Sequence, residues 1–136
     1  MIGEKPDFDT FITEHRWAVL TTLRKSGHPS SSVVAYAREG DTLVVSTPGT
    51  TFKRASLDRD PRMTLCIISN AEPFNFVTVE GRVDVETAGI KEATRLVFAN
   101  IADAGWREPD NLDEWLTTQQ RVILRLHPQR VSGVIR

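Results

Sequence analysis

The sequence has 136 residues, a length typical of one domain, and we expect a single domain over residues 1–136. Its 17 basic and 18 acidic side chains give a formal net charge of −1, which argues against a nucleic-acid partner held through many phosphate contacts. No run of ~18 apolar residues exists that could span a membrane. The single cysteine cannot form an intramolecular disulfide, and the N-terminus lacks the residue order of a signal peptide, so we expect a cytoplasmic location.

The order of apolar residues predicts a mainly β chain with helices inserted between the strands. About six strands are rich in β-branched residues and are separated by turns that contain Gly, Pro, Asn or Asp. They cover residues 17–23, 32–37, 43–46, 62–69, 74–85 and 122–135, the last broken at Pro128. Helical spacing covers residues 7–15, 52–57, 87–100 and 111–120. Because the connections are short, we expect antiparallel pairing and a small barrel that leaves few exposed edges.

One stretch, residues 46–54, has the pattern of an anion-binding site. A strand ends in hydroxyl residues, a Pro-Gly turn follows, and a helix begins with threonine caps and two cations. The first N–H groups of a helix lack partners within the helix, and its dipole places partial positive charge there, so such a segment can hold a phosphate. A plain capped helix with two solvated cations has the same pattern. The side chains concerned are Ser46, Thr47, Thr50, Thr51, Lys53 and Arg54.

Other kinds of site have little support in the sequence. There is no Gly-rich dinucleotide loop, no triphosphate loop and no nucleophile elbow. The three histidines lie far apart and none forms an i, i+4 pair, so we expect no metal site. Several aromatic residues near strand ends, Trp17, Phe74, Phe76 and Trp106, could stack on a planar ring or pack in the core or a dimer interface.

Three local patterns together resemble a known family. They are the run Trp17–Pro29 (WAVLTTLRKSGHP), Lys53 followed by the sequence DRDPR at residues 58–62, and the sequence VEGR at residues 79–82. They are similar to the pyridoxamine 5′-phosphate oxidase-like split-barrel flavoproteins, and more narrowly to the branch that uses the deazaflavin coenzyme F420. The resemblance covers roughly residues 8–135. Members that bind FMN, F420 or haem share this barrel.

The resemblance implies a six-stranded antiparallel split barrel of the FMN-binding type, assembled as a homodimer with a cofactor site at each subunit interface. In that family a lysine on the helix after the third strand holds the cofactor phosphate, and Lys53 matches it. The second strand lies along the isoalloxazine ring, and an aromatic residue approaches from the partner subunit. The residues that we assign to cofactor binding are Lys53, Arg54, Ser46, Thr47, Thr50, Thr51, Ser32, Val34, Tyr36 and Phe74.

The function that the resemblance implies is that of an F420-dependent oxidoreductase, which transfers a hydride from the reduced deazaflavin to an unsaturated small molecule. The alternatives are an FMN-binding reductase on the same fold and a non-catalytic flavin- or haem-binding protein. Arg24, Lys25 and Arg54 could meet the acidic tail of F420, or be ordinary surface charge. The chain lacks the C-terminal Trp and Arg motif of true pyridoxamine-phosphate oxidases, so we do not expect vitamin B6 oxidation. The sequence assigns no catalytic acid or base.

Overall fold

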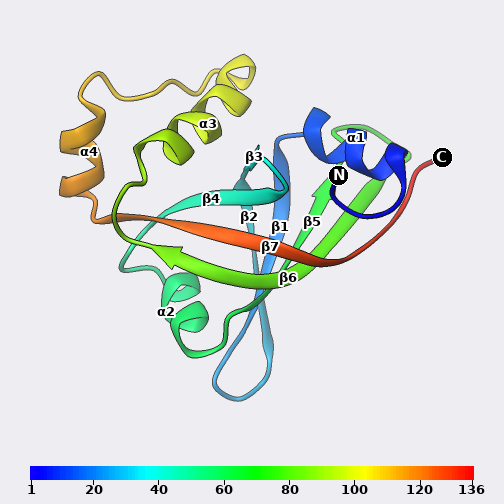
Figure 1. The fold of residues 1–136 in the computed structure, drawn as a ribbon, viewed down its shortest axis with the longest axis horizontal. Coiled ribbons are helices and arrows are strands. Elements are labelled where there is room, and N and C mark those ends of the chain that lie inside the picture. The colour runs from blue at the N-terminus through cyan, green and yellow to red at the C-terminus, as the bar shows by residue number, and fades with distance from the viewer.

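One curled antiparallel sheet forms the body of the protein, as the computed structural model of residues 1–136 shows (Figure 1). Its order is β2-β1-β5-β6-β7-β4-β3. The sheet curls into a half-barrel, which confirms the predicted mainly β, split-barrel fold. The seven strands are β1 (Trp17–Leu23), β2 (Pro29–Ala35), β3 (Ala37–Glu39), β4 (Thr42–Pro48), β5 (Arg62–Ile68), β6 (Phe76–Glu86) and β7 (Arg121–Val134).

The sheet has seven strands rather than six because the expected strand over residues 32–37 divides at Tyr36. β2 pairs with β1 at one edge of the sheet, whereas β3 pairs with β4 at the other edge. At the crossing point the Tyr36 hydroxyl donates to the carbonyl oxygen of Ile12 at 2.6 Å, which draws the ring inward. The barrel is therefore split between two strands that follow each other in the chain, and β2 is left with one unpaired edge.

The last strand, β7, runs through Pro128 without a break, contrary to the expectation of an interruption there. Pro128 has no N–H to donate, and it lies at a β-bulge where β6 shifts register between Glu80 and Gly81. Gly81 is needed at this point because a Cβ atom there would lie only 2.0 Å from the carbonyl oxygen of His127. The close backbone approach that a glycine inside this strand suggests is thus present.

Helices close the two ends of the half-barrel and cover one side. They are α1 (Pro6–Glu14), α2 (Phe52–Arg59), α3 (Lys91–Ile101) and α4 (Leu112–Thr118), with a short 3-10 turn at Ala102–Ala104. Phe11 of α1 and Leu57 of α2 belong to the main core of 19 buried residues on the inner face of the sheet. Val97 of α3 belongs to a second cluster of six against β4 and β7. None of the helices is long and apolar enough to cross a membrane.

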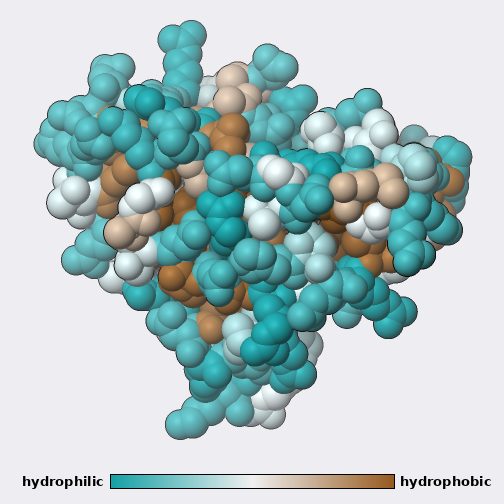
Figure 2. Space-filling model, in the orientation of Figure 1, coloured by the Kyte–Doolittle hydropathy of each residue, from teal (hydrophilic) through white to brown (hydrophobic).

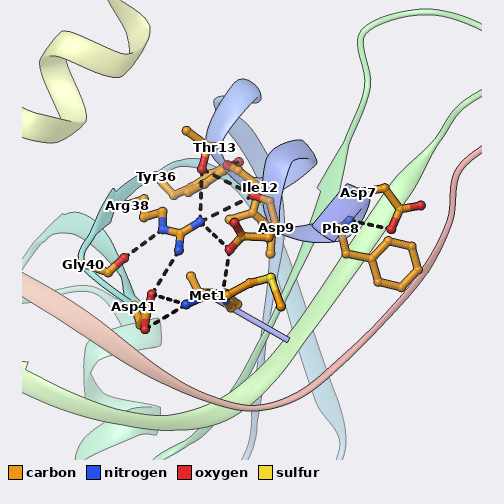
Figure 3. Close-up of polar contacts among 11 residues, drawn as sticks. Met1, Asp7, Phe8, Asp9, Ile12, Thr13, Tyr36, Arg38, Gly40 and Asp41 are labelled. Atoms are coloured by element: carbon orange, nitrogen blue, oxygen red, sulfur yellow. Dashed lines mark hydrogen bonds and ion pairs between the residues drawn. The ribbon is translucent and has the colours of Figure 1, made fainter. Parts of the chain in front are cut away.

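A polar network fixes α1 over one end of the sheet (Figure 3). Arg38 of β3 donates to the carboxylates of Asp9 at 2.8 Å and of Asp41 at 3.0 Å. The N–H of Ile2 and the Arg38 guanidinium together lower the pKa of Asp9. The N-terminal amine and Arg38 lower that of Asp41. This network holds the N-terminal segment against β3, at the end of the half-barrel opposite α2 (Figure 1).

Candidate functional site

The turn between β4 and α2 is fixed mainly by its own hydroxyl groups. The Thr51 hydroxyl accepts from the N–H of Arg54 at 3.4 Å, so Thr51 is the helix cap, and it lies 3.2 Å from the hydroxyl of buried Thr47. The N–H of Gly49 donates to the carbonyl oxygen of Gln120 at 2.7 Å. A Cβ atom at Gly49 would lie 2.6 Å from that oxygen, so the turn needs glycine to lie against β7. The capping threonines thus serve the turn itself.

Lys53 lines a small pocket of about 130 Å³ between α2 and the inner face of β1 and β2. Its ammonium group forms no hydrogen bond or ion pair with any side chain of the protein. The other lining residues are mainly hydroxyl or apolar side chains, namely Leu20, Thr22, Ser30, Ser32 and Phe52. Phe52 is 55% exposed at the pocket rim, with the Arg24 guanidinium 5.7 Å from its ring centre. A free cation therefore stands beside neutral hydroxyl groups and an unpaired strand edge.

Arg54, the next residue, faces the other side of α2. Its Nη1 donates to the carbonyl oxygen of Gly49 at 3.0 Å, and its Nε lies 2.8 Å from a carboxylate oxygen of Asp58. It lines a separate and larger pocket of about 540 Å³, together with the start of β7. The Ser46 hydroxyl also belongs to this side, because it accepts from Arg121 at 2.9 Å. The predicted anion-binding residues of the stretch 46–54 are therefore divided between two pockets.

Two of the predicted ring-binding residues, Ser32 and Val34, lie on β2, and the third, Tyr36, lies in the core. Every second residue of β2, namely Ser30, Ser32 and Val34, belongs to the inner face of the strand. This face is on the side of the Lys53 pocket. The assignment of Tyr36 is wrong, because its side chain is fully buried and its hydroxyl is used by Ile12. Figure 3 shows this ring directed into the structure beside α1.

Phe74 lies in the turn between β5 and β6, and its side chain is 51% exposed. β5 begins directly after α2 and ends at Ile68, so Phe74 lies at the far end of that strand from Lys53. A seven-residue strand is roughly 20 Å long. Within one chain, Phe74 is therefore far from the Lys53 pocket. Thr50, another predicted cofactor-binding residue, is exposed in the turn before α2.

The family model of pyridoxamine 5′-phosphate oxidase matches residues 5–135, nearly the whole chain. The chain belongs to the pyridoxamine 5′-phosphate oxidase family. No curated protein sequence matches it significantly.

Solved structures share the fold of this family member at low sequence identity. An F420 reductase is 17% identical with a TM-score of 0.76, and the match covers 95% of this chain and 98% of that one. A FAD-binding protein from Mesorhizobium loti is 20% identical with a TM-score of 0.72, over 98% and 95% of the two chains. A heme binding protein from Mycobacterium smegmatis is 21% identical with a TM-score of 0.72, but the match covers only 55% of that longer chain and 98% of this one. These likenesses establish the fold alone.

Sequence reasoning missed Arg121, which lies at the start of β7. Its guanidinium carbon lies 4.3 Å from the centre of the Trp115 ring, and it donates to both Ser46 and the side-chain oxygen of Gln119. Arg121 falls between a predicted helix and a predicted strand, and its partners are distant in sequence or on another element. Only the spacing of Trp115 and Arg121 across the end of a helix could have signalled their contact.

The fit of a flavin-type cofactor can be judged from the Lys53 pocket. A volume of about 130 Å³ admits a phosphate group but not a three-ring isoalloxazine. The ring would therefore lie outside the pocket, along the unpaired edge of β2. No group of three or more His, Cys, Asp or Glu side chains is placed to hold a metal ion. The pocket contains hydroxyl groups but no carboxylate or imidazole that could act as an acid or base.

Proposed function

We propose that this chain binds coenzyme F420 through Lys53 and is an oxidoreductase that transfers a hydride from the reduced deazaflavin to an unsaturated small molecule. The observation that carries the proposal is the unpartnered Lys53 ammonium beside the hydroxyl groups of the small pocket and the free edge of β2. One structure with the same fold is an F420 reductase and another is a FAD-binding protein, which supports a flavin-type cofactor.

The first turn of α2 provides the anion-binding groups. The N–H groups of Phe52 and Lys53 donate to no backbone acceptor, whereas those of Arg54 and Ala55 both bond to Thr51. Two N–H groups without an acceptor, the positive end of the helix dipole and the Lys53 side chain thus belong to the same helical turn, which lines the pocket. Hydrogen bonds between charged partners are roughly twice as strong as neutral ones, so Lys53 should dominate the binding of the cofactor phosphate.

The ring of the cofactor would lie along β2. As an edge strand, β2 has backbone N–H and C=O groups that no other strand pairs with, and these can bond to polar ring edges. Ser32 and Val34 would face the ring from the inner side of the strand. When bound, reduced F420 supplies the hydride, while the protein binds and orients it. Because the pocket has no acidic or basic side chain besides Lys53, the proton that completes the reduction would come from water.

The choice of F420 over FMN rests on a basic surface next to Phe52. A pocket of about 450 Å³ at the end of α2 is lined by five cationic side chains and a single carboxylate, that of Asp60. Arg24 joins this surface to the Lys53 pocket, because it lines the one and contacts Phe52 of the other. F420 carries an acidic tail that such a surface attracts, whereas FMN ends in its phosphate. The five cations are Arg24, Lys25, Arg59, Arg62 and Arg82.

The active form would be a homodimer. Apolar side chains lie half-exposed on the outer face of β1, β5 and β6, and the apolar residues of α1 and α2 pack against the inner face instead. Figure 2 shows hydrophobic residues in separate patches on a largely hydrophilic view of the molecule. Burial of the outer face against a second copy would also bring the β5–β6 turn of the partner, the turn that contains Phe74, toward the cofactor. The outer-face residues are Trp17, Val19, Cys66, Ile68 and Phe76.

Titration of the purified protein with each cofactor tests the proposal. We expect quenching of F420 fluorescence with micromolar or tighter affinity, weaker binding of FMN, and no Soret shift with haemin. Tight FMN binding without F420 binding would assign an FMN-dependent reductase, and a tight haem complex would assign a haem-binding protein. Light scattering at micromolar concentration should give the mass of a dimer.

A further inference from the structure

The second pocket beside α2 has an unusual balance of charge. It has a volume of about 540 Å³ and lies between α2, the loop before α3, helix α4 and the start of β7. Three cations and one carboxylate line it, namely Arg54, Lys91, Arg121 and Asp113. Because it lies on the Arg54 side of α2, it is separate from the pocket of Lys53.

Two of these cations have an acidic partner and the third has none. The Lys91 ammonium lies 3.1 Å from a carboxylate oxygen of Asp113, and Arg54 lies 2.8 Å from Asp58. Arg121 is half-buried and forms no ion pair with any carboxylate in the structure. Its burial lowers the pKa of the guanidinium, although not enough to remove its charge. An uncompensated charge that is partly removed from water is unfavourable, and an anionic ligand would relieve it.

The guanidinium of Arg121 is held in place by neutral groups. Its central carbon lies over the Trp115 ring, 4.3 Å from the ring centre. Nε and Nη2 donate to the Ser46 hydroxyl at 3.3 Å and 2.9 Å, and Nη1 donates to the Gln119 side-chain oxygen at 3.1 Å. A guanidinium has five N–H donors, so one donor on Nη1 and one on Nη2 are left over. Such a pair of donors matches the two oxygen atoms of a carboxylate or phosphate.

We propose that the pocket of Arg121 is a second anion-binding site, which takes the carboxylate or phosphate group of a small ligand. Arg121 would bind it through its two remaining N–H donors, with Arg54 and Lys91 adding positive charge at the walls. The pocket is open and much larger than a phosphate ion, so the rest of the ligand can extend along α4. The site is independent of the cofactor proposal, because α2 lies between the two pockets.

Isothermal titration at low ionic strength tests the site, with inorganic phosphate as one probe and succinate as the other. We expect one of them to bind the wild-type protein, and the preferred probe distinguishes a phosphate site from a carboxylate site. Arg121→Gln should weaken that binding at least about tenfold, because it removes a charged hydrogen-bond donor. Arg95→Gln is the matched control, since Arg95 lies on α3, pairs with Glu92 and Glu108, and does not line the pocket.

Two further measurements keep the outcome clear. Arg121→Lys keeps the charge but loses the planar pair of donors, so it should weaken binding several-fold even if the glutamine variant does not fold. F420 binding should be unchanged in Arg121→Gln. The proposal is overturned if neither anion binds, if the Arg121 and Arg95 variants lose affinity equally, or if Arg121→Gln weakens F420 binding as much as anion binding.

Discussion

The two sides of α2 differ in how the protein treats a positive charge. Lys53 has no partner and faces hydroxyl groups, whereas Arg54, its neighbour in sequence, is bound by Gly49 and Asp58. Successive residues of a helix point about 100° apart, so two adjacent cations need not share a ligand. Cations adjacent in sequence become one site only when they face the same pocket. On this helix they belong to two.

Substitution of Lys53 should have the largest effect and gives the sharpest test of that division. A hydrogen bond to a charged group contributes roughly 1.5–3 kcal/mol, and each ~1.4 kcal/mol is a factor of ten in affinity. Lys53→Ala should therefore weaken F420 binding by about 10–150-fold, measured by fluorescence titration. The melting temperature should change little, because the Lys53 ammonium forms no hydrogen bond or ion pair with the rest of the protein.

Arg54→Ala is the matched control for that prediction. Arg54 faces the other pocket, so its removal should weaken F420 binding several-fold less than that of Lys53. If the two variants weaken binding equally, the division of α2 into two sides does not govern binding. If neither does, α2 is only a capped helix.

A substitution at Gly49 should disturb both sides at once, because this residue fixes the turn before α2 against β7. An alanine there would place its Cβ atom 2.6 Å from the carbonyl oxygen of Gln120, so the backbone must move. Overpacking of this kind costs about 1–3 kcal/mol, measurable as a lower midpoint of urea unfolding. Gly40→Ala tests a strained glycine in open space, in the β3–β4 turn, and should leave both pockets intact. Equal loss of F420 affinity in the two variants would contradict a special role for the Gly49 turn.

Tyr36→Phe should lower the stability of the fold without changing cofactor binding. The Tyr36 hydroxyl donates to the carbonyl oxygen of Ile12, and both groups are buried. Loss of this hydrogen bond should lower the free energy of unfolding by about 1 kcal/mol, because the Ile12 oxygen keeps no other donor at that position. F420 affinity should stay at the wild-type value. A large loss of affinity without a loss of stability would return Tyr36 to the cofactor site.

These cases show what the sequence could and could not predict. Runs of strand-forming residues located β1 and β5, and alternation of apolar residues located β6, because a strand with one buried face has a period of two. A continuous run of strand-forming and small apolar residues covers 32–37 and hides the crossing at Tyr36, which depends on a contact with α1 distant in sequence. The Thr51 cap is local and was predictable. The contacts of Arg121 with Ser46 join residues 75 positions apart, so no local pattern reveals them.

The smallest expected effect concerns Arg62, which differs from Arg121 in having a carboxylate partner. Arg62 donates to Asp60 through its backbone N–H and its guanidinium, the closest contact being 2.7 Å. The hydrogen bonds from Arg62 lower the pKa of Asp60 from 3.8 to about 2. A carboxyl group whose pKa is lowered by folding stabilises the fold at any pH above the pKa that the group has in the unfolded chain. This stabilisation is lost as the pH falls from about 4 to about 2.

Asp60→Asn removes the group that titrates, so its stability should depend less on pH than that of the wild type in this range. Urea unfolding of both proteins at pH 5, 4 and 3 measures the difference, which should be small because both side chains are solvated. The asparagine variant also removes the one carboxylate from the basic surface of Arg24 and Arg82, so F420 affinity at neutral pH should rise slightly. The wild type and variant should converge at high salt, since screening weakens the attraction of an acidic tail. A lower affinity in the variant would show that Asp60 positions Arg62 for binding. On this surface the fixed position of the Arg62 side chain would then matter more than the net charge.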